Sequence, residues 1–138
     1  MSAVSVGTRV DALQVPPIDR EVLANYADAS GDHAAVHLDT EYARAMGFSD
    51  VIAHGLLVMA YLGRAVTSWR HTREMREFSC RFMTVTYVDD RLTCDGAVTA
   101  IRAVGPDRLA DLELRVINQD GDVKIKGNAT VVLQAARV

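Results

Sequence analysis

The segment that decides the fold is GLLVMAYLGRAVTS, residues 55–68. It is apolar almost all round, so a helix formed by it must be buried on most sides. At about 1.5 Å per residue such a helix is roughly 21 Å long, which is too short to span a bilayer. Gly63 lowers helix propensity in its middle, and close packing against another element would explain this glycine. We therefore expect one long buried helix at the centre of the molecule.

The second half of the chain alternates apolar and polar residues, the pattern of half-buried strands. Residues 78–82, 110–116 and 123–133 each place their apolar side chains on one face. In the last of these runs, the residues expected on the solvent face are Lys124, Lys126, Asn128 and Thr130. Residues 91–103 predict a further, less regular strand, with a bulge expected at Gly96.

Turn and cap residues divide the rest of the chain. Residues 119–122, Gln-Asp-Gly-Asp, carry the Asp-Gly signature of a hairpin turn. A short strand is expected over residues 10–15, followed by a helix that Asp19 caps and Gly31 ends. A second short helix is expected over residues 40–46.

Successive hairpins imply an antiparallel sheet with one apolar face, and one long apolar helix is available to cover it. The predicted fold class is therefore α+β, with the sheet wrapped around a central helix in the hot-dog architecture, in a single domain over residues 1–138. The pattern alone also permits other layered α+β arrangements. A lone protomer of this kind would leave an edge strand exposed, which favours a dimer.

Composition narrows the possible partners. The net charge is −3, from 15 basic and 18 acidic residues, so we expect neither nucleic acid nor a membrane as partner. The two cysteines, Cys80 and Cys94, lack metal-binding spacing and are expected to be reduced and buried. The first residues do not resemble a signal peptide, and we expect a cytoplasmic protein.

Titratable residues are dense in one loop, which contains Asp32, His33, His37 and Asp39. His54 lies directly before the buried helix. Such a cluster before two helices is a candidate site, although solvated loop residues would give the same pattern. A metal site is not expected, because His33 and His37 lack the glutamate of an HExxH motif. The cysteines lie in strand patterns and Ser30 lacks a nucleophile elbow, so covalent catalysis is not expected either.

General acid/base chemistry fits the loop better. Asp32 can accept a proton, His37 can pass one near neutral pH, and a curved loop could bring both onto one water molecule. Gly55 would present an unpaired N–H at the positive end of the apolar helix, which suits the oxyanion of a thioester carbonyl. A helix-entry turn is the alternative interpretation of His54-Gly55.

At these residues the sequence resembles the MaoC-like dehydratases, a family that includes (R)-specific enoyl-CoA hydratases and β-hydroxyacyl-ACP dehydratase subunits. The resemblance joins two separated motifs with a matching order of elements. The first runs from Tyr26 through Ser30-Gly31-Asp32, Val36 and His37 to Ala43, and the second is Ala53-His54-Gly55-Leu56.

The resemblance implies a lyase that hydrates trans-2-enoyl thioesters of CoA or acyl carrier protein and dehydrates (3R)-hydroxyacyl thioesters. Asp32 and His37 would be catalytic, and Gly55 with His54 would bind the thioester carbonyl. The family needs no cofactor and forms hot-dog dimers, either homodimers or heterodimers. Two departures are Ala34-Ala35, where the family has Asn-Pro, and Gly63, where many members have serine.

Three other functions remain open at this point: a structural subunit of a heteromeric dehydratase, a thioesterase, and an acyl-thioester-binding regulator. The presence of both Asp32 and His37 argues against a purely structural subunit. Hot-dog thioesterases usually place a carboxylate on the central helix, and residues 55–68 contain none.

Overall fold

The computed structural model describes residues 3–135 and contains one five-stranded antiparallel sheet with three α-helices. The strands are β1 (Arg9–Gln14), β2 (Thr72–Phe82), β3 (Thr93–Val104), β4 (Asp107–Ile117) and β5 (Val123–Leu133), in the sheet order β1-β3-β4-β5-β2. The helices are α1 (Arg20–Ser30), α2 (Thr40–Ala45) and α3 (Gly55–Thr67), with a short 3-10 turn at Ala35–His37. The hot-dog prediction is confirmed.

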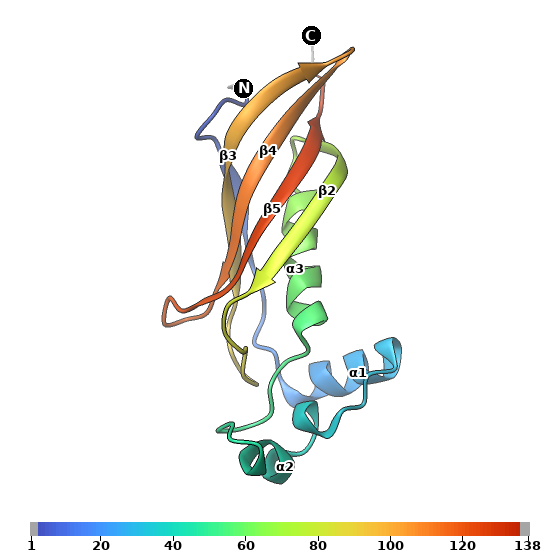
Figure 1. The fold of residues 1–138 in the computed structure, drawn as a ribbon, viewed down its shortest axis with the longest axis vertical. Helices are drawn as coiled ribbons and strands as arrows, with labels where there is room; N and C mark the ends of the chain where they lie inside the picture. The colour runs from blue at the N-terminus through green and yellow to red at the C-terminus, as the bar shows by residue number, and fades with distance from the viewer. Residues whose placement is uncertain (1–2, 136–138) are drawn as a thin grey trace.

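Helix α3 runs along the concave face of the curved sheet (Figure 1). Its apolar side chains pack against the inward-facing residues of the strands, and Leu62 and Val66 are fully buried. Gly55 lets the helix approach β2 closely, because a Cβ there would lie 3.2 Å from the Phe82 ring. Gly63 packs against Phe78 of β2, but a Cβ there would make an ordinary contact at 3.4 Å, so the expectation that close packing explains this glycine is not confirmed.

Helices α1 and α2 gather at the end of the sheet where α3 begins (Figure 1). Their ends follow the cap residues: Asp19 accepts a hydrogen bond from the Val22 N–H, and Gly31 ends α1 with φ +79°. This arrangement brings the loop after α1 next to the N-terminus of α3. Within residues 3–135, no helix is long and apolar enough to cross a membrane.

Two strand predictions are wrong. Gly96 is not the bulged residue, because it pairs with Val10 and Leu114. The pairing shifts between Val10 and Leu13 of β1 and between Val98 and Ala100 of β3. A Cβ at Gly96 would lie 2.5 Å from the Glu113 carbonyl oxygen, so glycine is required there by close approach of the backbone. Two of the residues expected on the solvent face of β5 are instead buried: Lys124 is 5% exposed and Thr130 is 7% exposed.

Candidate active site

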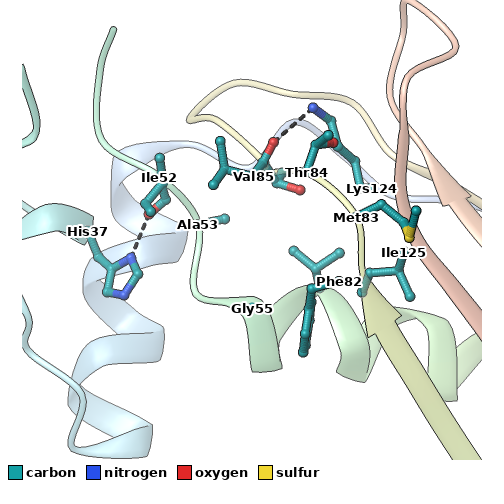
Figure 2. Close-up of a pocket in the computed structure, with 12 residues that line it drawn as sticks. His37, Ile52, Ala53, Gly55, Phe82, Met83, Thr84, Val85, Lys124 and Ile125 are labelled. Carbon is teal, nitrogen blue, oxygen red and sulfur yellow. Dashed lines mark hydrogen bonds between the residues drawn. The ribbon is translucent and has the colours of Figure 1, made fainter. Parts of the chain in front are cut away.

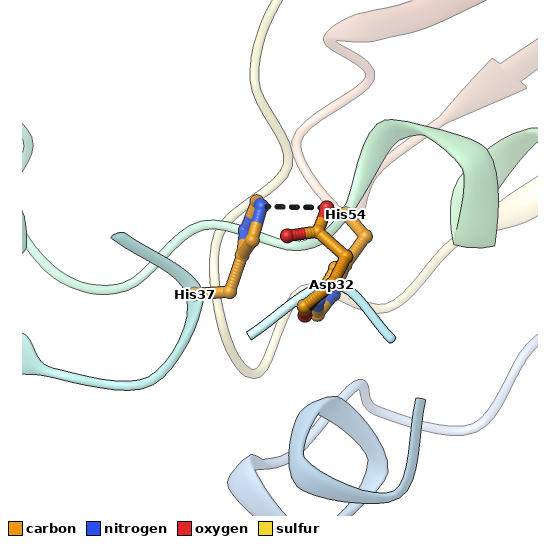
Figure 3. Close-up of side chains that lie close together, drawn as sticks. All are labelled: Asp32, His37 and His54. Carbon is orange, nitrogen blue, oxygen red and sulfur yellow. Dashed lines mark hydrogen bonds and ion pairs between the residues drawn. The ribbon is translucent and has the colours of Figure 1, made fainter. Parts of the chain in front are cut away.

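Asp32 lies directly after α1, in a turn that fixes its carboxylate. Its own N–H donates to Ser30 Oγ at 3.1 Å, and its Oδ1 accepts the Ala34 N–H at 3.1 Å. This local bonding is typical of an aspartate that competes with helical structure at a turn. Oδ1 is therefore occupied by the backbone, and Oδ2 faces His37 (Figure 3).

His37 ends the 3-10 turn and is fixed from the other side of the site. Its Nδ1 donates to the Ile52 carbonyl at 2.7 Å, and the Ile52 N–H donates to the Val36 carbonyl at 3.2 Å. Because a carbonyl can only accept, Nδ1 carries the hydrogen, and the neutral ring presents Nε2 as an acceptor. This second nitrogen is the one that faces Asp32.

The Asp32 Oδ2 and His37 Nε2 atoms are 3.8 Å apart. This separation is too long for a direct hydrogen bond, but one water molecule can lie within hydrogen-bonding distance of both atoms. The Asp32 side chain is 52% exposed and that of His37 is 12% exposed, so the pair lies at the boundary between solvent and interior. The arrangement can hold a water molecule and move a proton to or from it.

His54 is buried beneath this pair. Its ring stacks on His37, with ring centroids 3.9 Å apart and planes 24° apart, and it meets Tyr26 edge-on at 4.7 Å. Its Nε2 donates to the Asp32 carbonyl oxygen at 3.0 Å, while its Nδ1 has no hydrogen-bond partner among the described residues. Burial lowers the pKa of His54, which favours a neutral ring that supports Asp32 and His37.

A cavity of about 320 Å³ opens beside His37 (Figure 2). Gly55 lies on its wall at the N-terminus of α3, and no hydrogen-bond acceptor for its N–H is found within residues 3–135. The other residues that line it are Ile52, Ala53, Val58, Phe82, Met83, Thr84, Val85, Thr86, Lys124 and Ile125. A mostly apolar cavity next to an N–H at a helix N-terminus suits an acyl group with a carbonyl oxygen.

The structure separates the titratable residues that the sequence places in one loop. Asp32, His37 and His54 converge, whereas His33 turns outward and pairs with Asp28 at 3.0 Å, a contact that raises the pKa of His33. Asp39 caps α2 by accepting the Tyr42 N–H.

Two contributors to the site were not identified from the sequence. The Ile52 carbonyl that orients His37 carries no side-chain signal, so no pattern could have found it. Lys124 lines the cavity although strand alternation places it on the solvent face.

Metal binding fits this geometry poorly. Asp32, His37 and His54 each offer one ligand atom, and these atoms lie within 4.8 Å of one another. A metal ion, however, lies close to the plane of each imidazole that binds it, and the His37 and His54 rings are stacked nearly parallel. The cluster suits hydrogen bonding and proton transfer better than coordination.

Comparisons with known proteins identify the family and the fold. The family model described as "MaoC like domain" matches residues 2–119. The chain is 30% identical over 115 residues to an (R)-specific enoyl-CoA hydratase of Aeromonas caviae, covering 80% of this chain and 83% of the relative. It is 27% identical to a mitochondrial 3-hydroxyacyl-[acyl-carrier-protein] dehydratase of Solanum lycopersicum, over 83% of this chain and 69% of that protein.

The solved structure of an (R)-hydratase from A. caviae, described as involved in PHA biosynthesis, superposes with a TM-score of 0.83. The superposition covers 97% of this chain and 100% of that one, at 25% identity. The order and packing of elements around the candidate site are therefore shared with that protein.

Proposed function

The chain belongs to the MaoC-like family, and we propose that it catalyses the reversible hydration of trans-2-enoyl thioesters to (3R)-hydroxyacyl thioesters. The observation that carries this proposal is the 3.8 Å approach of Asp32 Oδ2 and His37 Nε2 beside the cavity at the start of α3. The hydratase and dehydratase names of the relatives support it. Carriage of the acyl group by CoA or by acyl carrier protein is compatible with the site.

In the hydration direction, Asp32 takes a proton from water as the water oxygen attacks the β-carbon of the enoyl group. His37 Nε2 accepts a hydrogen bond from the same water and orients it. The electron pair of the double bond moves to the thioester oxygen, where the Gly55 N–H stabilises the enolate. Asp32 then gives this proton to the α-carbon of the enolate. In the dehydration direction, the same steps run in reverse and release water. No cofactor enters this scheme.

The two departures from the family pattern leave this scheme intact. Asp32 is oriented by the Ser30 hydroxyl and the Ala34 backbone N–H, neither of which needs an asparagine or proline in the loop. At Gly63, the helix backbone faces the Phe78 ring, and neither residue contacts Asp32 or His37.

The test is an enoyl-CoA hydration assay with matched pairs of variants. Asp32→Asn and His37→Gln should each lower kcat/KM for crotonyl-CoA by about 10²–10⁴-fold, because each removes a group that handles the proton. The controls are Asp28→Asn and His33→Gln, an exposed pair that lies nearby and makes no contact with Asp32 Oδ2 or His37 Nε2. Wild-type turnover in both site variants would refute the assignment.

The same assay separates the other functions. Release of free CoA would indicate a thioesterase, a reaction that the absence of an acidic residue from residues 55–68 does not favour. Tight binding of substrate without turnover would indicate a regulator. Activity that appears only when a second hot-dog chain is added would indicate a subunit of a heteromeric enzyme.

We also propose that the chain works as a dimer, with a second copy or a related chain. Strand β2 is a long edge strand, and apolar side chains remain exposed beside the cavity: Leu56 at 65%, Phe82 at 52% and Met83 at 44%. Sedimentation velocity should give the mass of two chains, and a single-chain mass at assay concentration would contradict this. The cytoplasmic location stays a prediction.

A further inference from the structure

Lys124 is a buried lysine in the wall of the cavity that holds His37 and Gly55. Only 6% of its side chain is exposed, and lysines are rarely buried this completely unless they are paired. In Figure 2 it lies on the side of the cavity away from His37, on β5, with its amine next to the Val85 carbonyl. The surrounding wall is mostly apolar, so this cation is the exceptional group in it.

The bonding of Lys124 leaves hydrogen-bond donors free. Its Nζ donates to the Val85 carbonyl at 2.8 Å, and Asp90 Oδ2 is 4.0 Å away, beyond hydrogen-bonding distance. Asp90 accepts instead from the Tyr87 N–H and from the Gln119 amide, each at 2.9 Å. An ammonium group has three N–H donors, so two remain without an acceptor among the described residues.

A buried cation with free donors favours a ligand that carries an oxygen atom. Leaving a charged donor unpaired costs more than leaving a neutral one unpaired, and a substrate oxygen in the cavity would remove that cost. The nearby Asp90 carboxylate already balances the positive charge and would repel a second carboxylate. A neutral acceptor, such as a hydroxyl or keto oxygen, therefore fits best.

We propose that Lys124 determines specificity by binding a hydroxyl or keto oxygen on the acyl chain, away from the carbons that react. This inference rests on the proposed hydratase function and narrows its substrate class to oxygenated enoyl thioesters. It differs from a purely structural role, in which Lys124 would only hold the Val85 segment of the wall in place.

The experiment uses pairs of trans-2-enoyl-CoA substrates of five to about eight chain atoms, in which a terminal hydroxyl replaces a terminal methyl of the same size. For at least one chain length in this series, the wild-type kcat/KM should be about 10-fold higher for the hydroxyl substrate than for the methyl substrate. This factor corresponds to the free energy of one hydrogen bond to a charged donor. Lys124→Met should remove this preference, and Lys124→Arg, which keeps a cationic donor, should retain part of it.

The matched control is Lys126→Met, because Lys126 lies two residues along the same strand and is exposed. It should keep the wild-type preference. Thermal melting confirms that each variant is folded, and Lys124→Arg provides the folded comparison if Lys124→Met is not.

Equal losses on both substrates in Lys124→Met would show a structural role and overturn the inference, as would a wild type with no preference at any length. If the wild type hydrates no substrate, the proposed function has failed. The inference is then tested by calorimetric binding of the saturated hydroxyl and methyl acyl-CoAs, with the same expected preference and the same loss in Lys124→Met.

Discussion

The two ends of α3 are built in different ways. Along the sheet, the helix is held by apolar packing, with Leu62 and Val66 fully buried among the strands. At its N-terminal end, Leu23 of α1 and Ala43 of α2 are buried as well, but directed hydrogen bonds hold the loops in addition. Asp19 and Asp39 cap helices, and Arg20 binds both carboxylate oxygens of Asp50 at 3.0 Å. Packing gives stability without much geometric precision, whereas directed hydrogen bonds fix the orientation of individual groups.

This difference implies that stability and catalysis can be perturbed separately. The positions of Asp32 and His37 depend on bonds to Ser30, Ala34 and Ile52, none of which involves the sheet. Damage to the core should therefore lower the free energy of unfolding more than the activity of the folded protein.

The largest expected effect on stability is that of Leu62→Ala. Leu62 is fully buried on α3 and lies against Gly127 of β5, so truncation leaves a cavity between helix and sheet. We expect the free energy of unfolding, measured by urea denaturation, to fall by about 2–5 kcal/mol. The kcat/KM of the folded protein should change only a few-fold.

The control is Val104→Ala at the end of β3, outside the exposed apolar surface beside the cavity. Val104 is 48% exposed, and its truncation should change stability by less than about 0.5 kcal/mol. A hundred-fold loss of kcat/KM in folded Leu62→Ala would show that the core also holds the catalytic geometry, and the separation of the two ends would be wrong.

The sequence predicted the packed region better than the site. Apolar periodicity located α3 and the strands because burial repeats along an element. Lys124 and Thr130 are exceptions, because both follow the polar half of the alternation but are buried. Lys124 is covered by Val85 and Asp90, which come from a loop that the pattern cannot place. In the site region, the density of titratable residues indicated the loop, and the resemblance to the family motif selected Asp32 and His37 as candidates. Density alone could not distinguish them from His33 and Asp39, whose bonds to Asp28 and Tyr42 depend on local geometry.

A smaller effect is expected at Asp89, in the loop that forms the cavity wall. Its φ is +70°, a conformation that non-glycine residues rarely adopt, and its N–H donates to the Ile18 carbonyl at 2.6 Å. Asp89→Gly should raise the free energy of unfolding by about 0.5–1 kcal/mol, because relief of strain exceeds the added chain entropy. Asp120→Gly, in the β4–β5 turn, has no such strain to relieve and should not stabilise. A lower free energy of unfolding in Asp89→Gly would mean that the loss of the Asp89 side chain outweighs the relief of backbone strain.

The smallest expected effect concerns the acid stability of the site end, through Asp50. Hydrogen bonds from the Val51 N–H, Thr40 and Arg20 lower the pKa of Asp50 from 3.8 to about 2. A carboxyl group whose pKa is lowered by folding stabilises the native state above its unfolded pKa, and this contribution is lost as pH falls through the folded value. The stability difference between wild type and Asp50→Asn should therefore be constant above about pH 5 and shrink between about pH 4 and 2.

Solvent screens this exposed ion pair, which is why the effect should be modest. Urea denaturation of both proteins across this pH range measures it, with Asp120→Asn, a turn carboxylate without an ion pair among the described residues, reporting the general effect of removing one carboxylate. Neither α3 nor the sheet contributes a hydrogen bond to Asp50, whose partners are Val51, Thr40 and Arg20. The free energy of unfolding of Leu62→Ala should therefore depend on pH in the same way as that of wild type, at a lower value throughout. A difference between wild type and Asp50→Asn that stays constant down to pH 2 would show that these hydrogen bonds do not couple the loops to folding.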